Sequence, residues 1–338
     1  MPVRIGEREY TFWLDTGASF CAFDIIFTNL MGKPLQKGDM LTAGGLMASE
    51  LFSPPEAFLA KLDLRTGGPV ICVDLEGIRR ATGRDIRGVL GMEFLKNYVV
   101  RIDFDSGKVQ FRSWDGRDHP EWGAAVHLYQ AEEDRGVPST KARLPGVGNI
   151  TLIVDSGCNG AVGLVTEVFG RATDKVATSG GFTATAAGTR ETRLGRLGSL
   201  ALGGFDHHGL LVHEAIGNQI GLGLLSRHVV TFDFAGMKMY LQKGQAFGKP
   251  DESDMSGLHL WCIEGRILVH SVDKDSRAQT AGIRAEDVVL KVGDLSASAT
   301  NLDDLRDLLK SGDGKEIQMT IKRGDEEKVV TFKLKKRI

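Results

Sequence analysis

An internal repeat constrains this chain more than any other feature of its sequence. The stretch Phe-Trp-Leu-Asp-Thr-Gly at 12–17 is matched by Leu-Ile-Val-Asp-Ser-Gly at 152–157. Downstream, Gly-Val-Leu-Gly-Met at 88–92 is matched by Ile-Gly-Leu-Gly-Leu at 220–224. Each copy then runs into a strand-like segment ending in Asp-Phe, at 98–104 and 228–234. Because the offsets are nearly constant, the sequence predicts one structural unit used twice.

Within each copy the apolar runs are short, rich in Val, Ile and Phe, and bounded by Gly, Asp and Asn. This pattern is typical of β-strands joined by tight turns. We therefore expect a mainly β fold, with short helices near 91–97 and 222–228. The repeat also predicts two pseudo-symmetric lobes, at 1–118 and 119–243, joined by a breaker-rich linker at 113–123.

The repeated aspartates, Asp15 and Asp155, are the strongest candidates for chemistry. A pseudo-twofold axis between the copies would bring the two carboxyl groups together. Like charges about 4 Å apart repel by about 4 kcal/mol at an effective dielectric near 20, so the pair would hold one proton over a wide pH range. The ionised member would act as general base on a water, and the protonated member would donate to a carbonyl oxygen.

The neighbours of each aspartate fit this role. Gly17 and Gly157 allow a sharp turn that brings main-chain N–H groups toward the carboxylates. Thr16 and Ser156 supply short hydroxyls that we expect to hydrogen-bond backbone across the lobe interface.

Together, the two Asp-Thr/Ser-Gly segments and their downstream glycine motifs resemble the pepsin and retropepsin superfamily of aspartic peptidases, over about residues 1–243. The resemblance implies two β-barrel lobes in an acid-protease fold, catalytic Asp15 and Asp155, a polypeptide substrate in the cleft between the lobes, and no cofactor. Ala18 follows Gly17 as in retropepsins, and Cys158 stands where Ser or Thr is more usual.

Each copy also has paired glycines after its aspartate, Gly44-Gly45 and Gly180-Gly181. Paired glycines between β-forming residues suggest hairpin tips. We expect these four residues to form flaps over a bound substrate, although plain hairpin turns are nearly as good an interpretation.

After a polar, breaker-rich linker at 242–256, the segment 256–338 reads as a separate module. It predicts strands at 267–272, 287–292, 316–322 and 328–334, and a helix at 301–309 with Asn301 as its cap. These residues resemble a PDZ domain of the kind attached to bacterial proteases. The resemblance implies that Gly257, Leu258, His259 and Leu260 receive a peptide C-terminus, with the 301–309 helix as the other wall of the groove.

Composition narrows the partners. The net charge of the 338 residues is −2, which gives no reason to expect nucleic acid as a partner. No apolar run reaches the length of a transmembrane helix, so we expect no membrane span. We also expect the chain to be a monomer. No leader is visible, which makes a periplasmic or secreted location plausible only if a leader is missing.

Other chemistries find less support. The histidines at 207, 208 and 213 lack further clustered ligands, so we expect no metal. Asp155-Ser156-Gly157 also resembles the segment around a serine protease nucleophile, but the glycine before it and the glycine after it are missing and no histidine partner has a supporting context. One disulfide, between Cys21 and Cys158, stays open because each lies just past an Asp motif.

The sequence thus leads to a prediction of an aspartic endopeptidase acting through Asp15 and Asp155, with a PDZ domain that recruits polypeptides. The alternative is a catalytically inactive scaffold that binds peptides in both places.

Overall fold

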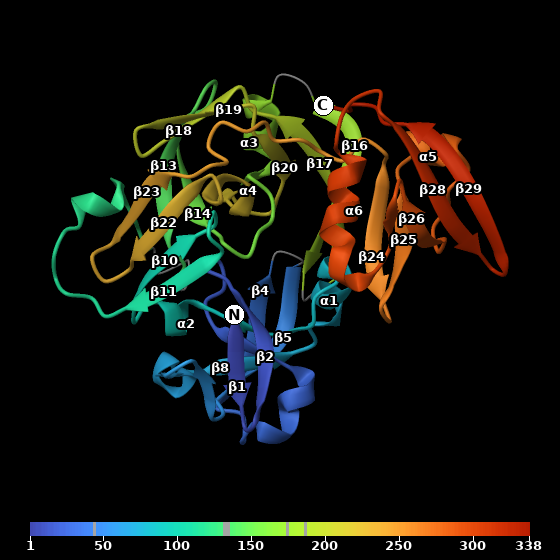
Figure 1. Ribbon diagram of the computed structural model, residues 1–338. Helices are drawn as coiled ribbons and strands as arrows, with labels where there is room; N and C mark the ends of the chain where they lie inside the picture. The colour runs from blue at the N-terminus through green and yellow to red at the C-terminus, as the bar shows by residue number, and fades with distance from the viewer. Residues whose placement is uncertain (43–44, 131–135, 174–175, 186–187) are drawn as a thin grey trace. The chain divides into compact units, whose positions relative to one another are not determined.

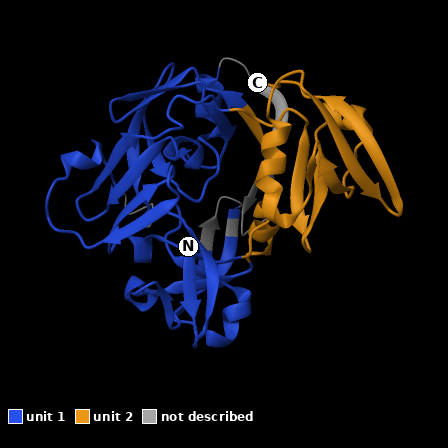
Figure 2. Ribbon diagram, in the orientation of Figure 1, with its two compact units in different colours: residues 1–74, 86–176, 195–251 blue, residues 75–85, 177–194, 252–338 orange. Residues whose placement is uncertain are grey.

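A computed structural model describes residues 1–42, 45–130, 136–173, 176–185 and 188–338. The described chain forms two compact units (Figure 2). Unit 1 contains Met1–Asp74, Ile86–Val176 and Gly195–Asp251, and unit 2 contains Leu75–Asp85, Ala177–Leu194 and Glu252–Ile338. The expectation of a mainly β chain is confirmed.

The first copy of the repeat forms a nine-stranded sheet with the order β4-β5-β8-β3-β9-β2-β1-β6-β7 (Figure 1). Its strands are β1 (Pro2–Ile5), β2 (Arg8–Leu14), β3 (Cys21–Asp24), β4 (Gln36–Thr42), β5 (Gly45–Phe52), β6 (Ala57–Leu59), β7 (Leu62–Asp63), β8 (Val70–Val73) and β9 (Ile86–Leu90).

The second copy forms another nine-stranded sheet, with the order β16-β17-β20-β15-β21-β14-β13-β18-β19. Its strands are β13 (Ser139–Leu144), β14 (Gly148–Val154), β15 (Val162–Leu164), β16 (Val176–Thr185), β17 (Gly188–Arg196), β18 (Ser199–Leu202), β19 (Phe205–His208), β20 (Leu211–Glu214) and β21 (Gln219–Ile220).

The two sheets have the same topology, position for position. The strand that carries each aspartate is parallel to the strand of the downstream glycine motif, β2 with β9 and β14 with β21. In both copies that second strand then pairs antiparallel with the strand after the aspartate loop, β3 or β15. The predicted internal repeat is therefore confirmed in the strand order. Both orders run from edge to edge, so the closed barrels that we expected are not found among the described strands.

Strands from the two copies meet in a five-stranded sheet of order β11-β10-β22-β23-β12. Its strands are β10 (Val99–Asp103), β11 (Lys108–Arg112), β12 (Ala124–His127), β22 (His228–Asp233) and β23 (Lys238–Lys243). The matched segments β10 and β22 pair antiparallel, with Arg101 opposite Thr231.

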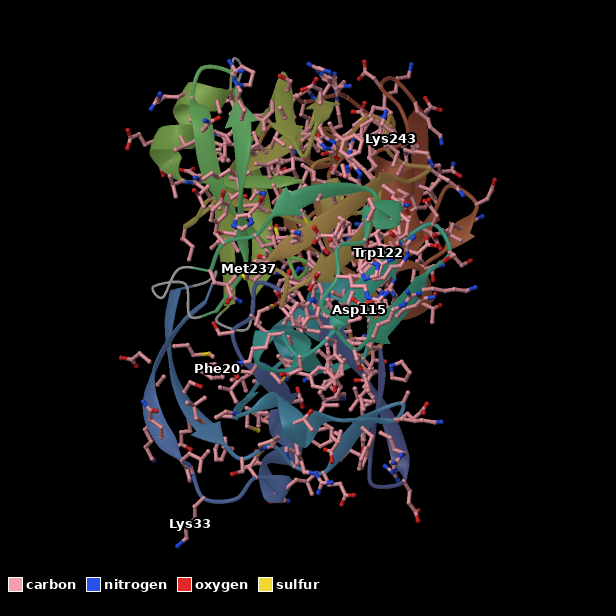
Figure 3. The ribbon with its side chains drawn as sticks, turned by 90° about the vertical axis from the view of Figure 1, so that its left-hand side faces the viewer. Phe20, Lys33, Asp115, Trp122, Met237 and Lys243 are labelled. Carbon is pink, nitrogen blue, oxygen red and sulfur yellow. The ribbon has the colours of Figure 1, made fainter. Side chains whose placement is uncertain are left out.

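The predicted linker at 113–123 is partly ordered by aromatic packing. The ring of His119 stacks on Trp122, 3.7 Å between centroids, and its Nε2 lies 3.0 Å from the Asp115 carboxylate. Trp122 also packs edge-on against Tyr240. Figure 3 shows Asp115 and Trp122 close together.

Unit 1 also contains short helices, among them those expected after each glycine motif. They are α2 (Met92–Leu95), α3 (Thr166–Ala172), α4 (Leu222–Leu225) and the 3₁₀ turns η1 (Ile25–Leu30), η2 (Leu64–Gly67) and η3 (Pro120–Trp122). Of these, α2 and α4 confirm the two predicted helices.

Unit 2 contains a sheet of order β24-β25-β26-β28-β29, with β27 paired to β26. Its elements are β24 (Leu258–Ile263), β25 (Arg266–Val272), α5 (Arg277–Thr280), β26 (Val288–Val292), β27 (Leu295–Ser296), η5 (Ala299–Asn301), α6 (Leu302–Leu309), β28 (Glu316–Arg323), β29 (Glu326–Lys333) and, from far earlier in the chain, α1 (Glu76–Thr82). Leu302, Leu305 and Leu309 of α6 are buried, as their helical spacing predicts.

The predicted cap of α6 is wrong in its detail. Asn301 makes no side-chain cap for α6. Its Oδ1 instead accepts from Ser298 N–H at 2.9 Å, and its Nδ2 donates to Ser296 O at 2.8 Å. A 3₁₀ turn, η5, precedes α6 and uses the asparagine to close its own capping box.

Candidate functional site

The first candidate site is the pair of aspartate loops in unit 1. Each loop begins where its strand ends, with Asp15 N–H donating to Leu90 O at 3.0 Å and Asp155 N–H donating to Ile220 O at 2.9 Å. Both aspartates are therefore tied to the strand of the downstream glycine motif that their repeat predicted.

The glycines of those motifs are required by close backbone packing. A Cβ at Gly91 would lie 2.2 Å from Phe20 O, and one at Gly221 would lie 2.5 Å from Cys158 O. The next N–H groups then hold the loops, since Met92 N–H donates to Ala18 O at 2.8 Å and Leu222 N–H to Cys158 O at 2.7 Å. The start of α2 or α4 thus fixes each aspartate loop.

The hydroxyls of Thr16 and Ser156 cross-link the two loops. Thr16 N–H donates to Ser156 Oγ and Ser156 N–H donates to Thr16 Oγ1, both at 3.0 Å. Thr16 Oγ1 donates to Val154 O at 2.6 Å, and Ser156 Oγ donates to Leu14 O at 3.0 Å. Both residues are buried. The expected bonding of these hydroxyls to backbone of the other copy is confirmed.

The carboxyl groups of Asp15 and Asp155 hydrogen-bond to one another. Each also faces the glycine of the other loop, because a Cβ at Gly157 would lie 2.4 Å from Asp15 Oδ2 and a Cβ at Gly17 would lie 2.6 Å from Asp155 Oδ1. The two glycines therefore provide the space in which the carboxyl groups meet.

The surroundings make the two carboxyl groups unequal. Burial, and then the charge of Asp155, raise the pKa of Asp15 well above its ordinary value. Burial also raises the pKa of Asp155, but N–H groups of Gly157 (2.9 Å) and Cys158 (3.0 Å) and the hydrogen bond from Asp15 oppose this. Asp15 Oδ1 likewise accepts from Gly17 N–H at 2.8 Å. Because two carboxyl groups in contact cannot both ionise at low cost, the pair holds one proton between them. The protonated carboxyl group can donate a proton, and the ionised one can accept a proton, within the same site.

The other residues that the sequence singled out within the repeat, and the cysteines, are placed as follows. Gly45 begins β5, and Gly44 lies outside the described residues. Gly180 and Gly181 lie inside β16 and not at a hairpin tip. His207 contacts His228, Nε2 to Nε2 at 3.4 Å, and burial lowers the pKa of each to about 4. Cys21, Cys72, Cys158 and Cys262 are free thiols in the structure.

The second candidate site is the predicted peptide groove of the PDZ module, whose expected walls are β24 and α6, two elements that are in contact in unit 2. In the sheet of described strands, β24 lies at one end and pairs with β25. Such an edge strand can accept another strand, as PDZ domains do with their peptides. The residues before β24 form a tight turn in which Gly257 has φ +83°.

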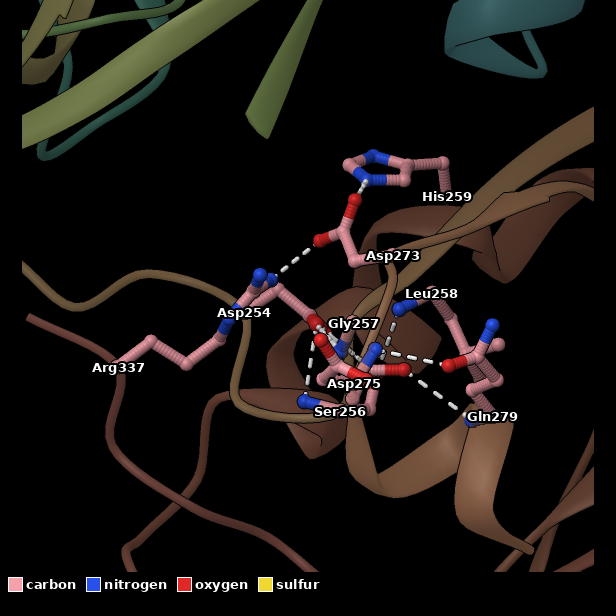
Figure 4. A network of polar contacts seen from close by, with 10 residues as sticks. Asp254, Ser256, Gly257, Leu258, His259, Asp273, Asp275, Gln279 and Arg337 are labelled. Atoms are coloured by element: carbon pink, nitrogen blue, oxygen red, sulfur yellow. Dashed lines mark hydrogen bonds and ion pairs between the residues drawn. The ribbon is translucent and has the colours of Figure 1, made fainter. Parts of the chain in front are cut away.

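The loop that we predicted to receive a carboxylate already holds one from its own chain (Figure 4). Asp254 Oδ1 accepts from Ser256 N–H at 2.9 Å and from Gly257 N–H at 2.5 Å, while Leu258 N–H donates to Ser256 Oγ at 3.1 Å. Burial raises the pKa of Asp254, although the Gly257 N–H opposes this. The first N–H groups of the predicted loop are therefore engaged.

The side chain of His259 is also held within the module. Its Nε2 lies 2.9 Å from Asp273 Oδ1, and Arg337 pairs with the same carboxylate (Figure 4). Sequence reasoning missed Asp254, although Asp followed by Ser and Gly two and three residues later is a turn signal.

Comparison with known proteins identifies the C-terminal module. A family model of the PDZ domain matches residues 268–323, so the chain contains a PDZ domain and that prediction is confirmed.

The chain is also similar to two proteins named "Probable CtpA-like serine protease". One, from Staphylococcus haemolyticus, is 40% identical over 68 residues, which are 20% of this chain and 14% of the relative. The other, from Staphylococcus aureus (strain COL), is 38% identical over 101 residues, 29% of this chain and 20% of the relative. The matches thus span a fifth or less of the relatives' own length.

These relatives contradict our prediction of an aspartic endopeptidase, because the proteases that share sequence with this chain are named for serine chemistry. The aspartyl, pepsin-like and retropepsin-like descriptions of the activity are corrected with it. The Asp-Thr/Ser-Gly repeat located a pair of carboxyl groups, but a short motif does not identify the bond on which such a pair acts.

Ser156, the serine of the second aspartate loop, does not offer a free hydroxyl for serine chemistry. Ser156 Oγ is buried, donates to Leu14 O and accepts from Thr16 N–H.

Within the part of the chain that the structure describes, each helix is too short or too polar to cross a bilayer.

Proposed function

We propose that this chain acts in proteolysis and that its PDZ domain binds extended segments of polypeptide. The observation that carries the proposal is the PDZ match at 268–323, together with the position of β24. This strand lies at the end of its sheet and contacts α6. The protease names of the relatives support the link to proteolysis.

The contacts at the start of β24 favour an internal segment over a peptide C-terminus as the ligand. Gly257 N–H is bound to Asp254 and Leu258 N–H to Ser256. A terminal carboxylate would have to displace these acceptors, and a buried N–H group that loses its partner costs about 1–3 kcal/mol. Of the four residues predicted to bind peptide, we therefore assign recognition to His259 and Leu260, where the edge of β24 begins.

We also propose that the two copies of the repeat are lobes of an acid-protease type of fold, 1–118 and 119–243, followed by the PDZ module at 256–338. Asp15 and Asp155 would be its catalytic acid–base pair, supported by Thr16, Gly17, Ser156 and Gly157. The hairpins β4–β5 and β16–β17, which contain Gly45, Gly180 and Gly181, would be its flaps, and the chain would act as a monomer.

Peptide binding can be tested with the full chain and arrayed twelve-residue apolar peptides, each made both as a free acid and as a C-terminal amide. We expect some peptides to bind, with affinities for acid and amide that agree within about twofold, since the loop offers little to a carboxylate. Val329→Glu, on an exposed part of β29, is the control that should leave binding unchanged. Failure of every peptide to bind would contradict the function, and a tenfold preference for acids would contradict the assignment to internal segments.

A further inference from the structure

A segment of the chain that precedes the PDZ domain by about 175 residues lies against the PDZ groove. Residues Leu75–Asp85, which contain α1, belong to unit 2 although their neighbours in sequence belong to unit 1. Within unit 2, α1 lies against β24, and α6 lies against the same strand. The segment therefore contacts one wall of the groove directly.

Arg306 connects the segment to both walls. Its Nη2, projecting from α6, donates to Ala81 O at 2.7 Å and to Leu260 O at 2.8 Å. Burial lowers the pKa of this guanidinium. Leu260 O belongs to the strand that would pair with a peptide, so one backbone acceptor of β24 is already bound while Arg306 holds α1.

The end of α1 also fits closely against the start of α6. Gly83 ends α1 in the left-handed conformation, φ +68°. A Cβ at this position would lie 2.8 Å from Ala299 O and 3.3 Å from Leu302 Cδ2. Next to it, Arg84 Nη2 pairs with Asp303 Oδ2 at 2.9 Å. The glycine thus allows an approach that a side chain would block.

The contact is not tightly sealed. A cavity of about 320 Å³ lies at the seam, lined among others by Thr82, Arg84 and Thr300. The side chains of Arg84 and Asp303 are mostly exposed, and such pairs contribute little to stability. Contacts of this kind can be exchanged for those of a competing ligand.

We propose that residues 75–85 are an internal ligand that covers the PDZ groove, latched by Arg306, and that a polypeptide must displace α1 in order to bind. This inference rests on the proposed function of the PDZ domain. It adds that the groove is occupied in the resting protein, so that the observed affinity for a peptide is reduced by the fraction of closed molecules.

The test compares three variants of the full chain with the natural chain. In the first variant, a Gly-Ser linker of equal length replaces Glu76–Thr82. The second is Arg84→Glu, which places a negative charge against Asp303, and its matched control is the charge swap Arg84→Glu with Asp303→Arg. Binding is measured with the peptides found above, and hydrogen exchange of the α1 amides is measured with and without peptide.

We expect the linker variant to bind peptide about tenfold more tightly than the natural chain, because the competing segment is gone. Arg84→Glu should tighten binding by about threefold, and the charge swap should restore the natural affinity. In the natural chain, peptide should speed exchange of the α1 amides.

Unchanged affinity in both variants, with α1 exchange unaffected by bound peptide, would overturn the internal ligand while leaving peptide binding intact. Absence of binding in every form, the linker variant included, would overturn the proposed function and this inference with it. Should the linker variant fail to fold, Arg84→Glu and its charge swap decide the question, since both substitutions are at exposed side chains.

Discussion

The two aspartate loops of unit 1 have nearly the same backbone, but different groups shift the pKa values of their carboxyl groups. Thr16 and Ser156 exchange equivalent hydrogen bonds at 3.0 Å, and Gly17 and Gly157 face the opposite carboxyl groups. Asp155 Oδ1 accepts from the N–H groups of Gly157 and Cys158, while Asp15 Oδ1 accepts from Gly17 N–H and its pKa is raised well above the usual range.

This difference teaches that a symmetric scaffold can hold an asymmetric charge. Two like carboxyl groups in contact cannot both ionise at low cost, so small differences in donors decide which one keeps the proton. Here the N–H of Cys158, 3.0 Å from Asp155 Oδ1, favours ionisation of Asp155. The repeat therefore determines the backbone of both loops, whereas single residues adjust the pKa of each carboxyl group.

The largest effects should come from the two hydroxyls, which test the symmetry of the scaffold. Thr16→Val and Ser156→Ala each leave a buried N–H and a buried carbonyl without their partner. We expect a loss of about 3 kcal/mol in the free energy of unfolding for each, measured by chemical denaturation. Thr66→Val, whose exposed hydroxyl bonds Asp63 O, should cost less than about 0.5 kcal/mol. Clearly unequal losses at Thr16 and Ser156 would break the symmetry.

The glycines that face the carboxyl groups should come next. Gly17→Ala and Gly157→Ala would place a Cβ 2.6 Å and 2.4 Å from the opposite aspartate, which overpacks the site. A loss of about 2 kcal/mol is expected for each in the same denaturation assay, with Gly157→Ala the larger. In contrast, Gly170→Ala in α3, where a Cβ meets nothing within 4 Å, should stabilise the chain by about 0.5–1 kcal/mol. If Gly157→Ala leaves the free energy of unfolding unchanged, the Asp15 carboxyl group does not lie this close to Gly157.

The last effect, the smallest when taken per pH unit, sharpens the asymmetry. Because the folded pKa of Asp15 is raised, the folded state keeps a proton that the unfolded state has released. This contribution to stability is complete below the unfolded pKa and is lost as pH rises through the folded pKa, by at most about 1.4 kcal/mol per pH unit. Between pH 4 and 8, the natural chain should therefore lose stability relative to Asp15→Asn. Parallel curves for the two proteins would contradict the raised pKa.

Local rules predicted the parts of unit 1 that depend on the backbone. The repeat, the turns at Asp15 and Asp155, and the helices after Gly91 and Gly221 follow from glycine positions and strand patterns, which act over a few residues. The expectation for Gly180 and Gly181 did not hold, because paired glycines can also lie inside a paired strand such as β16. The activity was predicted wrongly, since a motif carries less information about chemistry than about geometry.

Contacts between distant segments could not be predicted. The latch joins Ala81 to Arg306, which are 225 residues apart, and neither residue belongs to a recognisable motif. The carboxylate that fills the turn before β24 is a different case, because Asp254 lies just outside the four residues that the PDZ resemblance assigned to the peptide and its spacing from Ser256 and Gly257 is a local turn signal. The contact between Ala81 and Arg306 depends on packing that no local pattern encodes.

The most direct test of the asymmetric pair is a titration of the aspartate carboxyl carbons by NMR, with assignments from Asp15→Asn and Asp155→Asn. The account predicts that Asp15 titrates well above the ordinary range of an aspartate and that Asp155→Asn brings it partly back down, because the charge of Asp155 is removed. Burial should still hold the pKa of Asp15 above its usual value in that variant. If Asp15 instead titrates in the ordinary range and Asp155→Asn leaves it unmoved, the two carboxyl groups do not share a proton.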